Sequence, residues 1–137
     1  MSMKNSAGIL IYRRAGDETF ILVVQSRGGE TREPWSIPKG EFKLGIEDAR
    51  RAAVREVAEE LGIEIDPIEL SPLGESVYAN KKKRVHCFSW EARSELKLKL
   101  DEREISEAKF VPLDEARALL HEAHKVFVDR LVNELRS

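Results

Sequence analysis

The chain has 137 residues, of which 42% are hydrophobic, and carries 23 Lys+Arg against 25 Asp+Glu. This length predicts one soluble domain over residues 1–137, large enough to bury a core. The formal net charge of -2 excludes a generally basic nucleic-acid binder and an acidic disordered tail, unless the charges are segregated along the sequence.

The sequence contains one cysteine, Cys87. A disulfide framework and a thiolate cluster for zinc are therefore excluded, which favours a reducing compartment, and we expect a cytoplasmic protein. The apolar run at residues 7–12 is too short for a secretion signal, and no run approaches the roughly 18 apolar residues of a membrane span. We expect no membrane partner.

The first third of the chain predicts a hairpin and a loop. Residues 7–12 and 19–26 are β-rich apolar runs joined by a polar turn that contains Gly16 and Asp17. Glycines and prolines interrupt residues 27–44, which predicts a loop with at most a short strand at 35–37.

The remaining residues predict further strands and helices. Residues 48–61 form the clearest helix, with Asp48 as N-cap and Gly62 as C-cap. Strands are expected at 68–77 and 84–91, a short apolar run at 108–111, and helices at 113–120 and 125–135. This order predicts a layered α/β fold, with a mixed sheet covered by helices on both faces.

Three carboxylates share one face of the predicted helix 48–61. At 100° per residue, Glu56, Glu59 and Glu60 fall within an arc of about 100° beside the apolar stripe. Like charges at this spacing cost a few tenths of a kcal/mol per pair, so a hard divalent cation would relieve them, and oxygen ligands favour Mg²⁺ or Mn²⁺. The alternative is a solvated acidic face with Arg55 paired to Glu59.

The sequence around this helix resembles the Nudix box, the signature of hydrolases that act on nucleoside diphosphates linked to another moiety. Its pattern is Gly, then Glu, then Arg-Glu-aliphatic-any-Glu-Glu-any-Gly-aliphatic, and residues 47–63 match every specified position. Six residues separate Gly40 from Glu47, where the family usually has five. The approach at residues 35–40 is also similar to that of the family. The resemblance implies a Nudix-type α/β/α sandwich.

The resemblance also implies roles for the residues of the box. Arg55 orients the glutamates, Glu47 supports the site, and the metal ligands are Glu56, Glu59, Glu60 and the carbonyl of Gly40. Divalent metals neutralise phosphate charge and lower the pKa of bound water. A glutamate then accepts the proton of the attacking water.

In some family members that glutamate comes from the helix, and in others from a later loop. Glu56 and Glu59 are the helix candidates for this catalytic role, and Glu104 and Glu107 stand where the loop type occurs. The alternative for Glu104 and Glu107 is a pair of solvated loop acids.

A second segment bears on the substrate. Tyr78 is followed by a basic run at residues 81–84, which suits a base to stack on and several phosphates to neutralise. The segment resembles that of diadenosine tetraphosphate hydrolases, which implies Tyr78 as a base contact and Lys81, Lys83 and Lys39 as phosphate contacts. The alternative is a hairpin turn whose lysines keep it soluble and protect a sheet edge.

The histidines and tryptophans suggest no second site. His86 and Cys87 lie in a predicted strand, where a partly buried histidine and a small apolar thiol are expected. His121 and His124 have no zinc-ligand partner set. Trp35 and Trp90 are expected to serve packing, although Trp35 lies close to the box.

Taken together, the sequence predicts a Mg²⁺-dependent pyrophosphohydrolase (Mn²⁺ being the alternative metal) that acts on a dinucleoside polyphosphate such as diadenosine tetraphosphate. Nucleoside triphosphates, ADP-ribose or 5′-triphosphorylated RNA are alternative substrates. A ligand-binding Nudix domain without catalysis is a further alternative. Four clustered charges on a net-acidic chain predict weak nucleic-acid binding at most, and no stable complex. The oligomeric state stays open.

Overall fold

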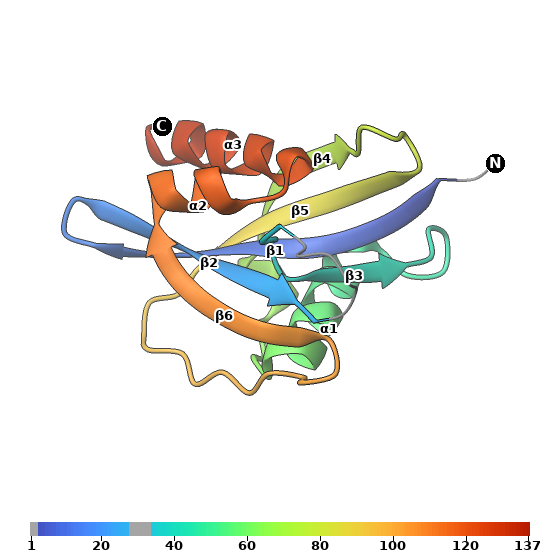
Figure 1. Ribbon diagram of the computed structural model, residues 1–137, viewed down its shortest axis with the longest axis horizontal. Helices are drawn as coiled ribbons and strands as arrows, with labels where there is room; N and C mark the ends of the chain where they lie inside the picture. Colours follow the sequence, from blue (N-terminus) through green and yellow to red (C-terminus); the bar gives the residue numbers. More distant parts are fainter. Residues whose placement is uncertain (1–2, 28–33) are drawn as a thin grey trace.

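The computed structural model describes residues 3–27 and 34–137, which contain a six-stranded mixed sheet (Figure 1). The strands are β1 (Lys4–Ala15), β2 (Glu18–Ser26), β3 (Lys39–Phe42), β4 (Ser71–Val77), β5 (Lys83–Glu91) and β6 (Ile105–Pro112). They lie in the order β4-β5-β1-β2-β6, and β3 pairs with β1 off this path. The β1 and β5 strands run parallel while the other pairs are antiparallel. The predicted mixed sheet is confirmed.

Helices cover both faces of this sheet (Figure 1). The helices are α1 (Ala49–Leu61), α2 (Leu113–Leu119) and α3 (Lys125–Leu135), with 3₁₀ turns η1 (Pro67–Glu69) and η2 (Glu122–His124). Side chains alternate along β1, so Ile9 and Ile11 join the core under α1, whereas Leu10 joins the core under α2 and α3. The predicted α/β sandwich is confirmed. No helix in the described part of the chain is long and apolar enough to cross a membrane.

Local sequence signals define the bounds of α1. The Asp48 side chain accepts a hydrogen bond from the Arg51 amide, and Gly62 ends the helix with φ 69° while its N–H donates to the Ala58 carbonyl. This left-handed conformation favours glycine, because a Cβ there is strained. Both predicted caps are confirmed.

The structure differs from the predicted elements where pairing with a distant strand determines whether a strand forms. The predicted loop 27–44 contains β3, whose pairing with residues 5–8 of β1 has no local signal. Trp35 and Ser36 make isolated bridges to Leu120 and Val24, not the predicted short strand. Residues 28–33 of that loop lie outside the described residues.

Two other strands have different bounds from those predicted. The strand predicted from residue 68 begins at Ser71, because Asp66 accepts a hydrogen bond from the Ile68 amide and caps the η1 turn before it. The β6 strand begins at Ile105 and not at residue 108, because its polar first residues pair with the end of β2. A local cap therefore shortens one strand, and tertiary pairing extends the other beyond its apolar run.

Candidate metal and phosphate site

Arg55 contacts three carboxylates from the exposed side of α1. Its Nε and Nη2 atoms donate to the two oxygens of Glu47 at 2.9 and 2.8 Å. Its Nη1 atom donates to Glu56 Oε1 at 2.8 Å and to Glu59 Oε1 at 3.3 Å. These hydrogen bonds hold the pKa of Glu47 below its ordinary value and that of Arg55 above it. Arg55 therefore fixes where three of the carboxylates point.

Two of the helix glutamates are buried. Glu56 is 8% exposed and Glu60 is 6% exposed, whereas Glu59 is exposed to solvent. A solvated acidic face therefore does not describe this helix, because two of its three carboxylates are turned into the protein. Buried carboxylates are costly unless a cation or hydrogen bonds compensate them.

Gly40 of β3 lies directly against the Glu56 carboxylate. A Cβ built at position 40 would collide with both oxygens of that carboxylate, so any larger residue here would displace the Glu56 carboxylate. The longer connection between Gly40 and Glu47 contains Gly45 at φ 87°, with nothing within 4 Å of its Cβ position. The extra residue is thus accommodated in an open turn, and Gly40 still lies beside the helix.

Glu60 is held against the backbone of β3. The Lys39 amide donates to Glu60 Oε1 at 3.1 Å. Burial raises the pKa of Glu60 to about 8; the Lys39 hydrogen bond and ammonium lower it, and Glu56 and Glu104 raise it further. Burial likewise raises the pKa of Glu56, against the opposing effect of Arg55. The positive charge near Glu56 and Glu60 is therefore too small to offset the cost of burying both carboxylates in their ionised form.

A cavity of about 260 Å³ opens beside Glu60. Charged side chains from four parts of the chain line it: Arg27, Lys39, Glu60, and Arg103 with Glu104. Burial lowers the pKa of Lys39 while Glu60 raises it. The cavity thus combines cations with carboxylates, which is the charge pattern expected for a metal and phosphate site.

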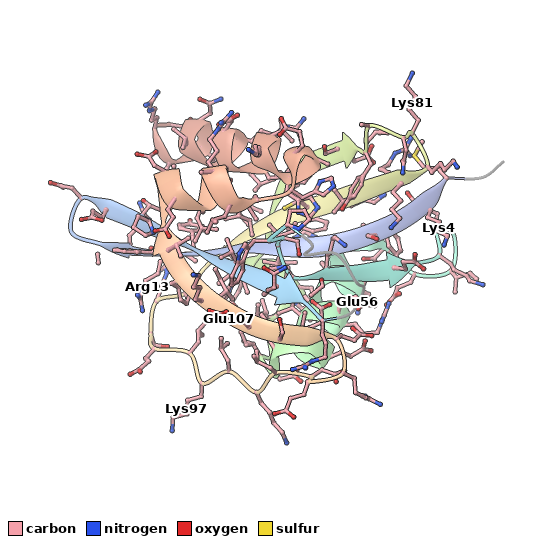
Figure 2. The ribbon with its side chains drawn as sticks, viewed as in Figure 1. Lys4, Arg13, Glu56, Lys81, Lys97 and Glu107 are labelled. Atoms are coloured by element: carbon pink, nitrogen blue, oxygen red, sulfur yellow. The ribbon has the colours of Figure 1, made fainter. Side chains whose placement is uncertain are left out.

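The structure separates the two loop carboxylates. Glu104 lines the cavity and raises the pKa of both Glu56 and Glu60 through its charge. Glu107 lies farther along β6, paired with Gln25 of β2, and is exposed. In Figure 2 its position on β6 is distinct from that of Glu56. Of the two, Glu104 is the one within electrostatic reach of the helix glutamates.

The predicted substrate contacts lie at different distances from this site. Lys81 is at the tip of the β4–β5 turn with φ 59°, and Figure 2 shows its side chain pointing outward, away from Glu56. Lys83 begins β5, and its charge lowers the pKa of Lys39. Lys39 and Lys83 are therefore electrostatic neighbours, whereas Lys81 points outward.

Tyr78 is half-buried against two histidines. Its hydroxyl lies 2.8 Å from His124 Nε2, and its ring lies 4.6 Å from the His121 ring, centre to centre. His124 is fully buried. Sequence reasoning missed this cluster, because 46 residues separate Tyr78 from His124 and no spacing rule connects them.

The other aromatic and sulfur groups follow the expected packing. Cys87 is buried, and burial raises the pKa of its thiol. His86 is partly buried between Asn5 and Glu75. Trp35 packs under Lys109, whose ammonium lies 4.8 Å from the ring centre.

Glu56, Glu59, Glu60 and the Gly40 carbonyl suit a hard divalent cation. The set consists of oxygen donors, two of them buried with raised pKa values, beside a glycine whose Cβ would fill the space. In the described ranges, no three Asp, Glu, His or Cys groups converge as a preformed metal cage. Arg55 donates to Oε1 of Glu56 and to Oε1 of Glu59, so it holds one oxygen of each of these two carboxylates.

The fold and these carboxylates define an α/β/α sandwich with an acidic helix face that suits divalent metal. A family model described as "NUDIX domain" matches residues 3–131. The chain belongs to the NUDIX family, and the predicted family is confirmed. It is 34% identical to Nudix hydrolase 7 of Arabidopsis thaliana over 113 residues, and 39% identical to a Nudix hydrolase of Caenorhabditis elegans over 67 residues. These matches cover 80% and 49% of this chain, which spans only 39% and 18% of the relatives' lengths.

Solved structures share the fold. A Caenorhabditis elegans Ap4A hydrolase in a binary complex matches with TM-score 0.80 and 23% identity, over 98% of each chain. The NUDIX domain of Shewanella oneidensis NrtR, solved with ADP-ribose, matches with TM-score 0.79 and 14% identity, over 98% of this chain and 90% of that one. At these identities the likeness concerns the fold alone.

Gly40→Ala should weaken metal binding. The added Cβ displaces the Glu56 carboxylate, and changes that displace the support of a metal ligand typically cost about 10- to 100-fold in affinity. Calorimetric titration with Mg²⁺ measures the change. Ile46→Ala is the control, because Ile46 lies in the same connection between Gly40 and Glu47 with its side chain 81% exposed, and this variant should keep the wild-type Mg²⁺ affinity. Unchanged Mg²⁺ affinity in a folded Gly40→Ala protein would contradict the assignment of this glycine.

Glu60→Gln should change the pH dependence of stability. The folded pKa, about 8, lies above the ordinary 4.5, so the folded state holds this proton more tightly than the unfolded chain. The metal-free protein therefore loses stability as pH rises from 4.5 to 8, and Glu60→Gln removes this loss.

Urea unfolding at pH 5 and pH 8, with and without Mg²⁺, measures the effect. At pH 8 the metal-free variant should be more stable than the wild type, and Mg²⁺ should stabilise it less. Glu64→Gln, just beyond α1 on an exposed residue, is the control and should behave like the wild type. If the wild type and Glu60→Gln show the same pH profile, the buried charge of Glu60 has no energetic effect.

Proposed function

We propose that this protein is a Mg²⁺-dependent pyrophosphohydrolase that cleaves a diphosphate linkage in a dinucleoside polyphosphate such as diadenosine tetraphosphate. The observation that carries the proposal is the pair of buried, undercompensated carboxylates, Glu56 and Glu60, beside a cavity that Lys39 and Glu104 also line. Membership of the NUDIX family supports the reaction class. The single buried cysteine is consistent with the cytoplasmic location that we propose.

Glu56, Glu59, Glu60 and the Gly40 carbonyl would hold the metal. When bound, Mg²⁺ or Mn²⁺ neutralises phosphate charge and lowers the pKa of water. Arg55 orients Glu56 and Glu59 through Nη1, and Glu47 fixes the guanidinium from the other side. Arg55 and Glu47 thus orient the carboxylates that would bind the metal.

Lys39 lines the cavity beside Glu60, and Lys83 is an electrostatic neighbour of Lys39, so both cations are suited to bind phosphate oxygens. Lys81 points outward, which suits a phosphate farther along an extended substrate. The Tyr78 ring lies beside this basic turn with one face against His121, so a base would stack on its other face. A substrate with two nucleosides and several phosphates uses all of these groups.

Proton removal from the attacking water falls to Glu104 in this proposal. It lines the cavity, and unlike Glu56 and Glu60 it is exposed and not a proposed metal ligand. Glu59 is the alternative base, but its carboxylate accepts a hydrogen bond from Arg55 at 3.3 Å. A carboxylate without such a partner keeps its oxygens available for the proton.

ADP-ribose is the second candidate substrate. The likeness to the NrtR domain solved with ADP-ribose is nearly as high as that to the Ap4A hydrolase, so the fold does not separate the two. Nucleoside triphosphates and 5′-triphosphorylated RNA contain the same type of bond. A binding domain without catalysis is disfavoured because Glu47, Glu56, Glu59 and Glu60 are all present.

A panel assay tests the substrate. Diadenosine tetraphosphate, ADP-ribose, ATP and 5′-triphosphorylated RNA are each incubated with Mg²⁺, and products are identified by chromatography and mass spectrometry. We expect the highest kcat/KM for diadenosine tetraphosphate, with Glu56→Gln as the inactive control against contaminants. Absence of cleavage of any dinucleoside polyphosphate at micromolar concentration would reject this substrate, and cleavage of another panel member would retain the reaction class.

Glu104→Gln should lower kcat about 100-fold or more, since positioned general bases contribute typically 10²- to 10⁴-fold. The fold and the Mg²⁺ affinity should be retained, because Glu104 is exposed and outside the proposed ligand set. Glu107→Gln on the same strand is the matched control and should keep wild-type kcat. Equal effects of the two substitutions would remove Glu104 from the reaction.

A further inference from the structure

The hydroxyl of Tyr78 is held by a buried histidine 46 residues farther along the chain. His124 Nε2 lies 2.8 Å from the Tyr78 oxygen, and the other ring nitrogen, Nδ1, accepts a hydrogen bond from the Ile37 amide at 3.4 Å. The His121 amide also donates to the Trp35 carbonyl at 2.8 Å. The turn at residues 121–124 is thereby fixed to the segment that leads into Lys39 and Gly40.

These contacts determine which ring nitrogen of His124 carries the proton. A backbone N–H always donates, so Nδ1 accepts from Ile37 and carries no hydrogen in this arrangement. The ring is fully buried, and burial lowers the pKa of His124 to about 3, with Lys39 and His121 lowering it further. A neutral ring with a bare Nδ1 has its proton on Nε2, which then donates to the Tyr78 oxygen.

The direction of this hydrogen bond decides what Tyr78 offers to a ligand. Since its oxygen accepts from His124, its own proton is directed elsewhere. Among the described residues, His124 is the one hydrogen-bond partner of the hydroxyl. The hydroxyl therefore retains an unused donor and the ring a fixed orientation.

We propose that His124 is a positioning residue that makes the Tyr78 hydroxyl a hydrogen-bond donor to an acceptor atom of the bound nucleotide. The acceptor is a phosphate oxygen or a nitrogen or oxygen of the nucleoside. The assignment of Tyr78 to the ligand rests on the proposed function, whereas the protonation of His124 does not.

Two further contacts support this role for Tyr78. One face of its ring is covered by His121, so the ring is not open to bases on both faces. Lys39, which lines the cavity, is also an electrostatic neighbour of His124. The Tyr78 and His124 pair therefore lies near the cation that faces Glu60, and a donor here adds to the charge that recognises a phosphorylated ligand.

Nitrogen-15 NMR of the imidazole groups tests the protonation directly and needs no substrate. We expect His124 to give a protonated Nε2 and an unprotonated Nδ1 from pH 6 to pH 8, with the Nε2 signal shifted in Tyr78→Phe. Observation of the tautomer protonated on Nδ1, or of a ring that titrates across this range, would overturn the proposal.

Ligand binding tests the donor. The dissociation constants of ADP and of inorganic tripolyphosphate are measured by calorimetry for the wild type, Tyr78→Phe, His124→Asn and His124→Gln. Loss of one neutral hydrogen bond should weaken binding about 3- to 10-fold in Tyr78→Phe and in His124→Asn, which lacks a donor at the Nε2 position. His124→Gln presents an amide N–H near that position and should restore affinity to within about twofold.

The two ligands identify the acceptor. Weaker binding of tripolyphosphate to Tyr78→Phe assigns the acceptor to phosphate, and weaker binding of ADP alone assigns it to the nucleoside; both outcomes support the proposal. Unchanged affinity of Tyr78→Phe for both ligands, or no binding of either by the wild type, would overturn the donor role.

Kinetics separate positioning from a general loss of structure. With a substrate from the panel, Tyr78→Phe and His124→Asn should raise KM by the same factor while kcat stays within about twofold. The double variant should show no further increase in KM, because both substitutions abolish the same hydrogen bond from Tyr78 to the ligand. If His124→Asn fails to fold, Tyr78→Phe and the NMR spectrum of the wild type decide the question. Failure of the panel would reject the proposed function, while the NMR and calorimetric results still decide the role of His124.

Discussion

The burial of Glu56 and Glu60 is the constraint on which the other features of the site depend. A carboxylate removed from water must be compensated, and both groups have raised pKa values because the surrounding protein compensates them incompletely. Three features make their burial possible: the absence of a side chain at Gly40, the amide of Lys39, and the guanidinium of Arg55. The first two come from β3 and the third from α1 itself, and all three lie at one side of this helix.

The topology brings these features together. The β3 strand pairs with the first half of β1, and α1 packs against the same part of the sheet, so the Lys39 amide and Gly40 lie against the helix glutamates. Glu104 comes from a separate segment, just before β6, where the Arg27 amide donates a hydrogen bond to the Glu104 carbonyl. Pairing of β6 with β2 thus brings a third carboxylate to two that are already undercompensated.

Sequence reasoning identified what is encoded locally. The caps Asp48 and Gly62, the acidic face of the helix and the hairpin at Gly16 each depend on neighbours a few residues apart. It did not identify β3, because four residues containing a glycine show no strand pattern until β1 supplies the partner. It also did not identify the contact of Tyr78 with His124, since the two residues meet only through the packing of η2 against β4. Which glutamates are buried was similarly invisible, because the helical wheel places Glu59 beside Glu60 without showing that only Glu60 faces β3.

The distribution of charge now gives a physical reason for a cation at this site. The net charge of -2 conceals a local imbalance: Arg55 shares its hydrogen bonds among Glu47, Glu56 and Glu59, while Lys39 lies nearer Glu60 with its own pKa lowered by burial. Neither cation neutralises the pair Glu56 and Glu60, and Glu104 adds a further negative charge. A polyphosphate alone would be repelled by this arrangement, and a divalent cation alone would leave Lys39 and Lys83 facing it without a counter-charge. Bound together, the metal satisfies the carboxylates and the phosphates satisfy the lysines, so the charge balance of this site favours joint binding of the two.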